Sequence, residues 1–168
     1  MKDINFIKNI DNLGRIVIPM DIRRKLQINT GDVLSITCND KDIMLTKYSS
    51  LDNNMKIIEM IKSFIEILEL KVILVNRECV LYSNLVNIGC KLGNEVKLLV
   101  KNGNSIKSQS NEFIFGENKV NGIYNMLPIV TNEGVIGSII VFGDINEKGF
   151  EMCTLLAKII MLELNISW

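Results

Sequence analysis

Four cationic side chains near the start of the chain are well suited to bind a polyanion: Lys8, Arg15, Arg23 and Arg24. An arginine guanidinium is planar and always charged, and its paired N–H donors match phosphate oxygens or the edge of a guanine. Arg15 directly follows a glycine, whereas Arg23 and Arg24 stand together eight residues later. If one compact unit brings these cations to one face, that face has the chemistry to bind nucleic acid.

The run Arg23–Lys25 also has an interpretation that needs no ligand. Asp21 stands near the start of the same short segment, and the three cations stand near its end. The helix dipole favours this charge distribution, so it is also typical of an ordinary solvent-exposed helix. Net charge hardly separates the two interpretations. Residues 1–50 carry eight Lys/Arg and six Asp, and residues 51–168 carry eleven Lys/Arg and thirteen Asp/Glu.

Other kinds of site find little support in the composition. The chain has no histidine, which is the most common general base and metal ligand. Its four cysteines form no Cys-x-x-Cys pair, so we expect reduced and mostly buried thiols rather than a zinc site. We therefore expect no catalytic residue, no metal and no cofactor.

The sequence also bears on location. The first residues lack the shape of a signal peptide. The longest apolar run, near Val135–Phe142, is far shorter than the roughly 20 residues that a membrane-spanning helix needs. We expect a cytoplasmic, nucleoid-associated protein with no membrane partner.

The elements that would position the cations are short. Residues 4–10 and 15–18 have strand patterns and flank the turn sequence Asp-Asn-Leu-Gly at 11–14. A short helix is predicted from Pro19 to Leu26, because proline is tolerated in a first turn and apolar residues then recur every four positions. Two more strands are predicted after a turn at 29–32: residues 34–38 and 43–48. A β–β–α–β–β unit of about fifty residues buries too little surface to be stable alone, so we expect two chains to share strands.

A second domain is expected after a polar linker. The predicted boundaries are residues 1–50 for the first domain, 51–54 for the linker and 55–168 for the second domain. The expected elements are a helix at 55–70, strands at 72–75 and 79–82, the start of a short helix at 84–90, strands at 127–131 and 135–142, and a final helix at 150–164. Residues 91–119 show no clear pattern. This order indicates an α+β domain with a mostly antiparallel sheet.

The motif around the arginines resembles a known family. Residues 13–19 read Leu-Gly-Arg-Ile-Val-Ile-Pro, and residues 22–26 read Ile-Arg-Arg-Lys-Leu. Together with 31–36 and 43–48, they resemble the AbrB-type swapped-hairpin DNA-binding domain of bacterial transition-state regulators over residues 4–48. The resemblance implies a β-rich barrel made by the interleaved hairpins of two chains, with Arg15, Arg23 and Arg24 on the DNA. Position 8 is commonly arginine in that family, and Lys8 keeps the charge but loses the bidentate fork.

The second domain resembles a GAF domain, a sensor fold, in its element order and in residues 127–130 and 134–142. The layout of an AbrB-type domain followed by a GAF-like domain resembles that of two-domain sporulation regulators, and this resemblance implies a homotetramer built from two dimers, joined through the helices at 55–70 and 150–164. The resemblance to a GAF domain also implies a small-molecule pocket in residues 84–126, for an unidentified ligand. Four side chains are candidates to line that pocket: Asn87, Lys91, Ser105 and Tyr124.

The function that these features predict is sequence-selective binding of double-stranded DNA by a transcription regulator of sporulation or stationary-phase genes. One alternative is a swapped-hairpin antitoxin that binds a toxin partner, although antitoxin tails are usually short and disordered. Another alternative is a GAF-type methionine-sulfoxide reductase that uses Cys79 and Cys90. The missing histidine and the absence of a motif disfavour this enzyme.

Overall fold

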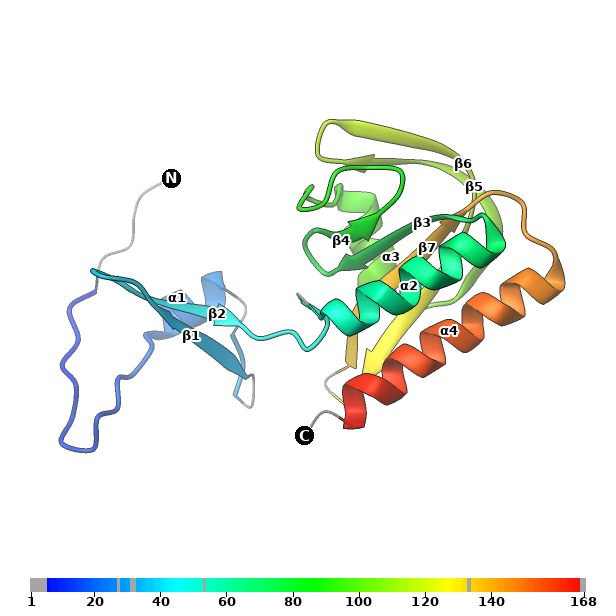
Figure 1. Ribbon diagram of the computed structural model, residues 1–168. Coiled ribbons are helices and arrows are strands. Elements are labelled where there is room, and N and C mark those ends of the chain that lie inside the picture. The colour runs from blue at the N-terminus through cyan, green and yellow to red at the C-terminus, as the bar shows by residue number, and fades with distance from the viewer. Residues whose placement is uncertain (1–5, 27, 31–32, 53, 133, 167–168) are drawn as a thin grey trace. The chain divides into compact units, whose positions relative to one another are not determined.

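The structure is a computed structural model that describes residues 6–26, 28–30, 33–52, 54–132 and 134–166. It divides the chain into two compact units, Met1–Tyr48 and Ser49–Trp168, which are described separately (Figure 1). Parts of several predicted features lie outside the described residues: positions 4–5 of the first strand, the Gly31-Asp32 turn, and Glu133 in the last hairpin turn.

The N-terminal unit contains one short helix and one hairpin. Its elements are α1 (Met20–Lys25), β1 (Leu34–Cys38) and β2 (Ile43–Lys47). The two strands pair antiparallel with Ile36 opposite Leu45, and a turn closes them through a hydrogen bond from the Asn39 N–H to the Asp42 carbonyl. The predicted helix and the last two predicted strands are therefore confirmed.

The prediction of two strands at 4–10 and 15–18 is wrong for the described residues of the isolated chain. Residues 6–10 and 15–19 are extended but have no strand assignment, and they flank only a closed turn. A strand needs a neighbour to take up its backbone N–H and C=O groups, and a single hairpin is marginal in water. Within one chain these segments do not find that neighbour.

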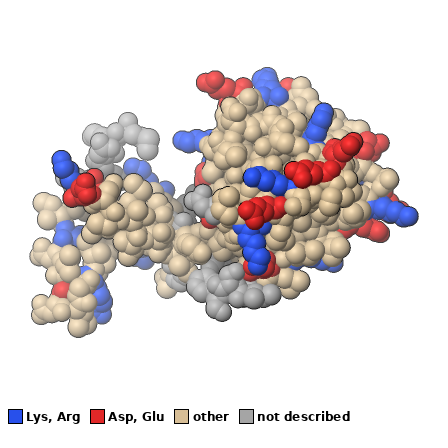
Figure 2. Space-filling model, in the orientation of Figure 1, with Lys and Arg blue, Asp and Glu red and all other residues tan. Residues whose placement is uncertain are grey.

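No described residue from position 6 to position 48 is buried. Large apolar side chains are instead exposed along the whole unit, among them Ile7 (92%), Leu13 (74%), Val17 (73%), Ile36 (70%) and Ile43 (71%). Figure 2 shows that uncharged side chains cover much of this unit. Within one chain, the described part of this unit therefore lacks a core of its own. Because burial of apolar surface is the main driving force of folding, such a unit has little to stabilise it alone.

The second unit is an α+β domain with one antiparallel sheet, as predicted. Its elements are α2 (Met55–Leu68), β3 (Lys71–Asn76), β4 (Val80–Ser83), α3 (Asn94–Asn102), β5 (Ile106–Phe115), β6 (Asn118–Thr131), β7 (Gly134–Phe142) and α4 (Glu147–Ile166). The strand order is β4-β3-β7-β6-β5, so the central strand β7, which is the last in sequence, pairs with β3, which is the first strand of the domain. The helices α2 and α4 lie side by side on one face of the sheet (Figure 1).

A hydrophobic core fills each face of the sheet. One core joins Val72, Leu74 and Val141 of the sheet to α2 and α4, for example through Ile61 and Ile160. The other core lies between the sheet and α3. Its aromatic centre is a set of edge-to-face contacts, with the Phe113 ring 4.6 Å from Tyr124 and 6.1 Å from Phe142. Such buried aromatic contacts account for much of the stabilising burial in a small domain.

The second unit begins earlier than the predicted linker allows. Leu51 is 1% exposed and belongs to the core beneath α2 and α4. Asp52 accepts a hydrogen bond from the Asn76 side chain at 2.9 Å, and Asn54 caps α2 through the Ile57 N–H at 3.2 Å. The described part of the predicted linker is thus docked on the domain. Gly137 leaves the space that the Leu51 side chain occupies. A Cβ at position 137 would overlap the Val75 carbonyl and lie 2.6 Å from Leu51.

The middle of the domain departs most from expectation. Residues 84–90 form turns rather than a short helix. The unpatterned residues 91–119 contain α3 and the whole of β5, and β6 begins nine residues before the predicted strand at 127–131. The alternation in β5 is weak because the first half of this edge strand carries polar side chains.

The four cysteines are free thiols, but only Cys153 is buried. Burial raises the pKa of the Cys153 thiol to about 11. Cys38 is exposed, and Cys79 and Cys90 are partly exposed, so the expectation of mostly buried cysteines is wrong. Within the described part of the chain, no helix has both the length and the apolar character needed to cross a membrane.

Candidate nucleic-acid interface

Arg15 is held by a turn that Asp11 organises. The Asp11 N–H donates to the Arg15 carbonyl at 3.0 Å, and the Gly14 N–H donates to the Asp11 carbonyl at 2.9 Å. Asp11 Oδ1 accepts from the N–H groups of Leu13 (2.9 Å) and Arg15 (2.8 Å). Gly14 has φ +74°, a value that glycine adopts without strain. The sequence Asp-Asn-Leu-Gly-Arg therefore closes a tight loop with Arg15 at its exit.

The Asp11 carboxylate also binds the Arg15 side chain. Arg15 Nε lies 2.8 Å from Asp11 Oδ2, while the two side chains remain 71% and 42% exposed. The Arg15 backbone hydrogen bond, followed by its side-chain hydrogen bond, holds the pKa of Asp11 below its usual range. The carboxylate is therefore ionised at neutral pH, and its negative charge lies directly beside the guanidinium.

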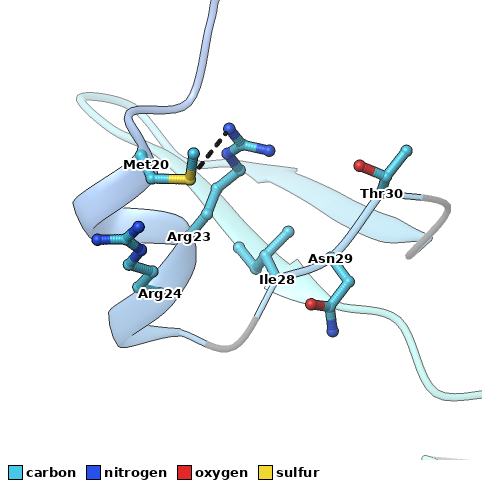
Figure 3. Close-up of a pocket in the computed structure, with 6 residues that line it drawn as sticks. All are labelled: Met20, Arg23, Arg24, Ile28, Asn29 and Thr30. Carbon is cyan, nitrogen blue, oxygen red and sulfur yellow. Dashed lines mark hydrogen bonds between the residues drawn. The ribbon is translucent and has the colours of Figure 1, made fainter.

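Arg23 and Arg24 line one hollow beside α1. The Arg23 N–H donates a hydrogen bond to the Pro19 carbonyl. After the helix ends, the Ile28 N–H donates a hydrogen bond to the Arg23 carbonyl at 2.8 Å. This second hydrogen bond holds residues 28–30 next to the helix. A hollow of about 500 Å³ results, and Figure 3 shows its lining side chains: Met20, Arg23, Arg24, Ile28, Asn29 and Thr30.

The two arginines differ in their surroundings. Arg23 is half-buried, with one terminal amino group 3.6 Å from the sulfur of Met20, and its Nε is buried without a hydrogen-bond partner. Arg24 is exposed, and Figure 3 shows its guanidinium on the other side of Met20. A buried N–H without a partner is energetically costly.

The predicted DNA-contacting residues thus fall into separate places in the isolated chain. Arg23 and Arg24 share the hollow, Arg15 stands at the Asp11 turn, and Lys8 is exposed on the extended segment before that turn. Sequence reasoning treated Asp11 only as part of a turn and missed its contact with Arg15, although the spacing of four residues was a usable signal. It also missed the position of Asn29 and Thr30 beside the two arginines, because the sequence marks them only as part of a turn.

The candidate ligand-pocket residues of the second unit do not share one environment. Asn87, Lys91 and Ser105 are exposed. Tyr124 is 2% exposed and packs in the aromatic core, with its hydroxyl 3.3 Å from the Gln109 side chain. Among the described residues, no group of three acidic, cysteine or histidine side chains is placed to hold a metal ion.

The first unit has recognisable relatives among known proteins. Residues 7–52 match a family model described as "Antidote-toxin recognition MazE, bacterial antitoxin". A segment of 52 residues is 46% identical to stage V sporulation protein T of Bacillus subtilis, and 48 residues are 44% identical to the transition state regulatory protein AbrB of the same organism. Residues 7–52 form a MazE/AbrB-type domain. It is homologous to the corresponding segments of these two regulators, which confirms the resemblance of the arginine motif.

The sequence matches to these two regulators each cover less than a third of the chain. They cover 30% and 29% of this chain, and they span 29% of stage V sporulation protein T and 50% of AbrB. The putative transition state regulator Abh of B. subtilis is 40% identical over 48 residues. A solved structure, the cofactor-binding GAF domain of the nutrient sensor CodY from Clostridium difficile, has a TM-score of 0.46 at 13% identity and covers 86% of this chain and 93% of its own.

Proposed function

We propose that the chain is a DNA-binding transcription regulator, selective for sequence and active in sporulation or stationary phase, whose N-terminal unit contacts double-stranded DNA. One observation carries this proposal. Lys8, Arg15, Arg23 and Arg24 all lie within residues 7–52, the part of the chain that forms the MazE/AbrB-type domain. A 52-residue segment of the chain is 46% identical to a named sporulation protein. No catalytic group is part of the proposal. We propose no small-molecule ligand either, because the Tyr124 side chain is buried in the core where a ligand pocket was expected.

A homodimer through the N-terminal units is part of the proposed function. The unit buries no described residue in the single chain, and its segments 6–10 and 15–19 are extended without a strand partner. A second copy would supply both the missing strand neighbours and the apolar cover for Ile7, Val17 and Ile36. A two-fold axis would also double the cations into one basic strip, which suits a duplex with two-fold related half-sites.

A second contact between copies is proposed at the GAF-like unit. A mostly apolar hollow of about 440 Å³ lies between α2 and α4, and Phe64, Ile67 and Ile159 are among the residues that line it. Ile67 (76%), Leu155 (57%) and Leu162 (60%) are exposed on the same two helices. Apolar helix surface of this extent is typical of a contact face, and pairing of these faces would join two dimers into a tetramer.

The antitoxin interpretation is the competing function, and the description of the matched family model favours it. An antitoxin of the expected kind carries a disordered tail that folds on its toxin. The residues after position 52 instead form a sheet with a core on each face. We therefore prefer DNA regulation, and the DNA experiment separates the two.

The experiment is selection of DNA by the full-length protein from a random-sequence duplex pool, followed by fluorescence anisotropy on an enriched duplex. The Arg23→Ala and Arg24→Ala variants should each weaken binding by about 1–3 kcal/mol, as expected for a base-reading arginine. Affinity should also fall steeply as salt rises, because each neutralised phosphate releases counterions.

Lys101→Ala is the matched control, since Lys101 is an exposed cation at the end of α3 in the other unit. This variant should bind DNA like the wild type. Equal losses for Lys101→Ala and the arginine variants would show that only total charge matters. A failure to enrich any duplex, with capture of a toxin-like partner instead, would favour the antitoxin.

A further inference from the structure

We propose that Asp11 is a positioning residue for DNA recognition, which acts by holding the Arg15 guanidinium in the orientation that reads a base. This inference rests on the proposed DNA-binding function and adds a residue to it. An acidic side chain is unexpected on a surface that must approach phosphates, because its charge opposes the polyanion. The hydrogen bonds around Asp11 give a reason for its presence.

The carboxylate fixes Arg15 at both backbone and side chain. Asp11 Oδ1 accepts from the Arg15 N–H, Asp11 Oδ2 accepts from Arg15 Nε, and the Arg15 carbonyl accepts from the Asp11 N–H, all within 3.0 Å. The two backbone hydrogen bonds fix the Arg15 main chain beside the carboxylate, so the hydrogen bond from Nε restrains the side chain more than a lone exposed ion pair would. Gly14 supports this arrangement, because its φ of +74° closes the turn.

The orientation is suited to recognition. The contact with Asp11 occupies Nε, and the terminal Nη groups carry the remaining N–H donors of the guanidinium. The Arg15 side chain is 71% exposed, so these groups face solvent. Holding a flexible side chain in its bound conformation reduces the entropy lost on binding. A bidentate contact with guanine depends on such alignment, whereas a phosphate contact does not.

The two effects of Asp11 therefore have opposite signs and can be separated. Its charge weakens binding to any DNA, whereas its alignment of Arg15 strengthens binding only to the correct sequence. In Asp11→Asn, the side-chain oxygen can still accept from the backbone N–H groups of Leu13 and Arg15, while the carboxylate pair with Nε is lost. Affinity for random-sequence DNA should then stay equal or rise, and affinity for the selected duplex should fall.

The test measures the ratio of affinities for the selected duplex and a shuffled duplex, with the full-length wild type, Asp11→Asn, Arg15→Ala and the double variant. The ratio should fall roughly threefold or more in Asp11→Asn, which is part of the roughly 5- to 150-fold discrimination that one bidentate base contact provides. In the Arg15→Ala background, Asp11→Asn should not change the ratio further. Asp40→Asn is the charge control, because Asp40 is an exposed carboxylate in the β1–β2 turn, and it should leave the ratio unchanged.

Each other result has a distinct meaning. An unchanged ratio in Asp11→Asn, with a reduced ratio in Arg15→Ala, would overturn the role of Asp11 but keep the DNA surface. Equal strengthening on both duplexes would show that Asp11 acts only through its charge and would also overturn it. Wild-type binding by Arg15→Ala would refute the proposed DNA-binding role of Arg15 and the role of Asp11 with it. Loss of folded structure in Asp11→Asn, measured by circular dichroism, would assign Asp11 a purely structural role.

Discussion

The cations of the N-terminal unit have different environments, and these suit different tasks. Arg15 is restrained by Asp11, and Arg23 is half-buried beside Met20. Both are therefore partly preorganised, which favours directional contacts with base edges. Lys8 is an exposed ammonium on an extended segment. An ammonium on a flexible stem suits a phosphate better than a base pair.

This difference predicts the behaviour of Lys8→Ala. We expect the variant to weaken binding by a similar factor on the selected and shuffled duplexes, because a phosphate contact carries no sequence information. A plot of log affinity against log salt should become shallower by about one unit per lost contact in each chain. Anisotropy titrations at several salt concentrations measure both quantities. A selective loss on the chosen duplex would instead assign base recognition to Lys8.

Two glycines in the second unit differ in how much space their surroundings leave for a side chain. Gly137 lies on the central strand β7, where the Val75 carbonyl and Leu51 fill the space that a side chain would need. Gly149 lies in the first turn of α4, and a Cβ there would meet Asn146 Oδ1 at 3.4 Å, an ordinary contact. The same methyl group therefore overlaps a packed core in one element and makes only ordinary contacts in the other.

Alanine substitutions at these glycines should have opposite effects on stability. Gly137→Ala should lower the free energy of unfolding by about 1–3 kcal/mol, because it forces β7 away from its neighbours. Gly149→Ala should raise it by about 0.5–1 kcal/mol, because glycine within a helix carries an entropic cost. Urea unfolding of the full chain, followed by circular dichroism, measures both changes. A neutral Gly137→Ala would contradict the docking of Leu51 described above.

At the scale of the whole molecule, the two units differ in what one chain can supply. The second unit has two cores of its own, whereas the first has apolar surface and incomplete strand pairing. Under the proposed function, the first unit would depend on another copy for its fold, and DNA binding would depend on that assembly. Lys and Arg lie among Asp and Glu on the visible face of the second unit (Figure 2), so that face offers no uniform basic surface for DNA.

The isolated fragment of residues 1–49 should be a dimer. Its folding and its association should occur together, so the midpoint of thermal unfolding should rise with protein concentration. Analytical ultracentrifugation and circular dichroism at a series of concentrations measure this behaviour. A folded monomer with a midpoint independent of concentration would contradict strand sharing between chains.

The variant Ile159→Glu should convert tetramers into dimers without unfolding the domain. Ile159 is 42% exposed beside the apolar hollow between α2 and α4, so a charge there opposes a contact between copies while leaving the core intact. Deleting α4 would be a poorer test, because Leu156 and Ile160 are buried. Light scattering on the full chain measures the mass.

Ile114→Glu is the matched control for the tetramer test. Ile114 is 45% exposed but lies on the edge strand β5, so the same substitution at similar exposure should leave the mass unchanged. Equal masses for Ile159→Glu and the wild type would show that the α2–α4 face does not join the dimers.

Much of this protein could be predicted from short-range signals in its sequence. The Gly-Arg motif and the following Ile-Arg-Arg-Lys-Leu identified the N-terminal domain, because residue types at fixed spacing determine a turn, a short helix and a cationic face. The long apolar patterns of α2, β7 and α4 likewise predicted an α+β domain with an antiparallel sheet. These signals depend on neighbours along the chain, and the sequence shows those neighbours directly.

What only the tertiary structure decided depends on contacts between distant segments. The polar edge strand β5 and the helix α3 showed no clear pattern, because their burial is set by partners far away in the sequence. Leu51 lies in a polar segment and becomes a core residue only where it meets Gly137. At the proposed DNA-binding surface, the sequence determined which arginines are present. The fold decided that Arg15 is held by Asp11, and that Arg23 and Arg24 share a hollow with Thr30.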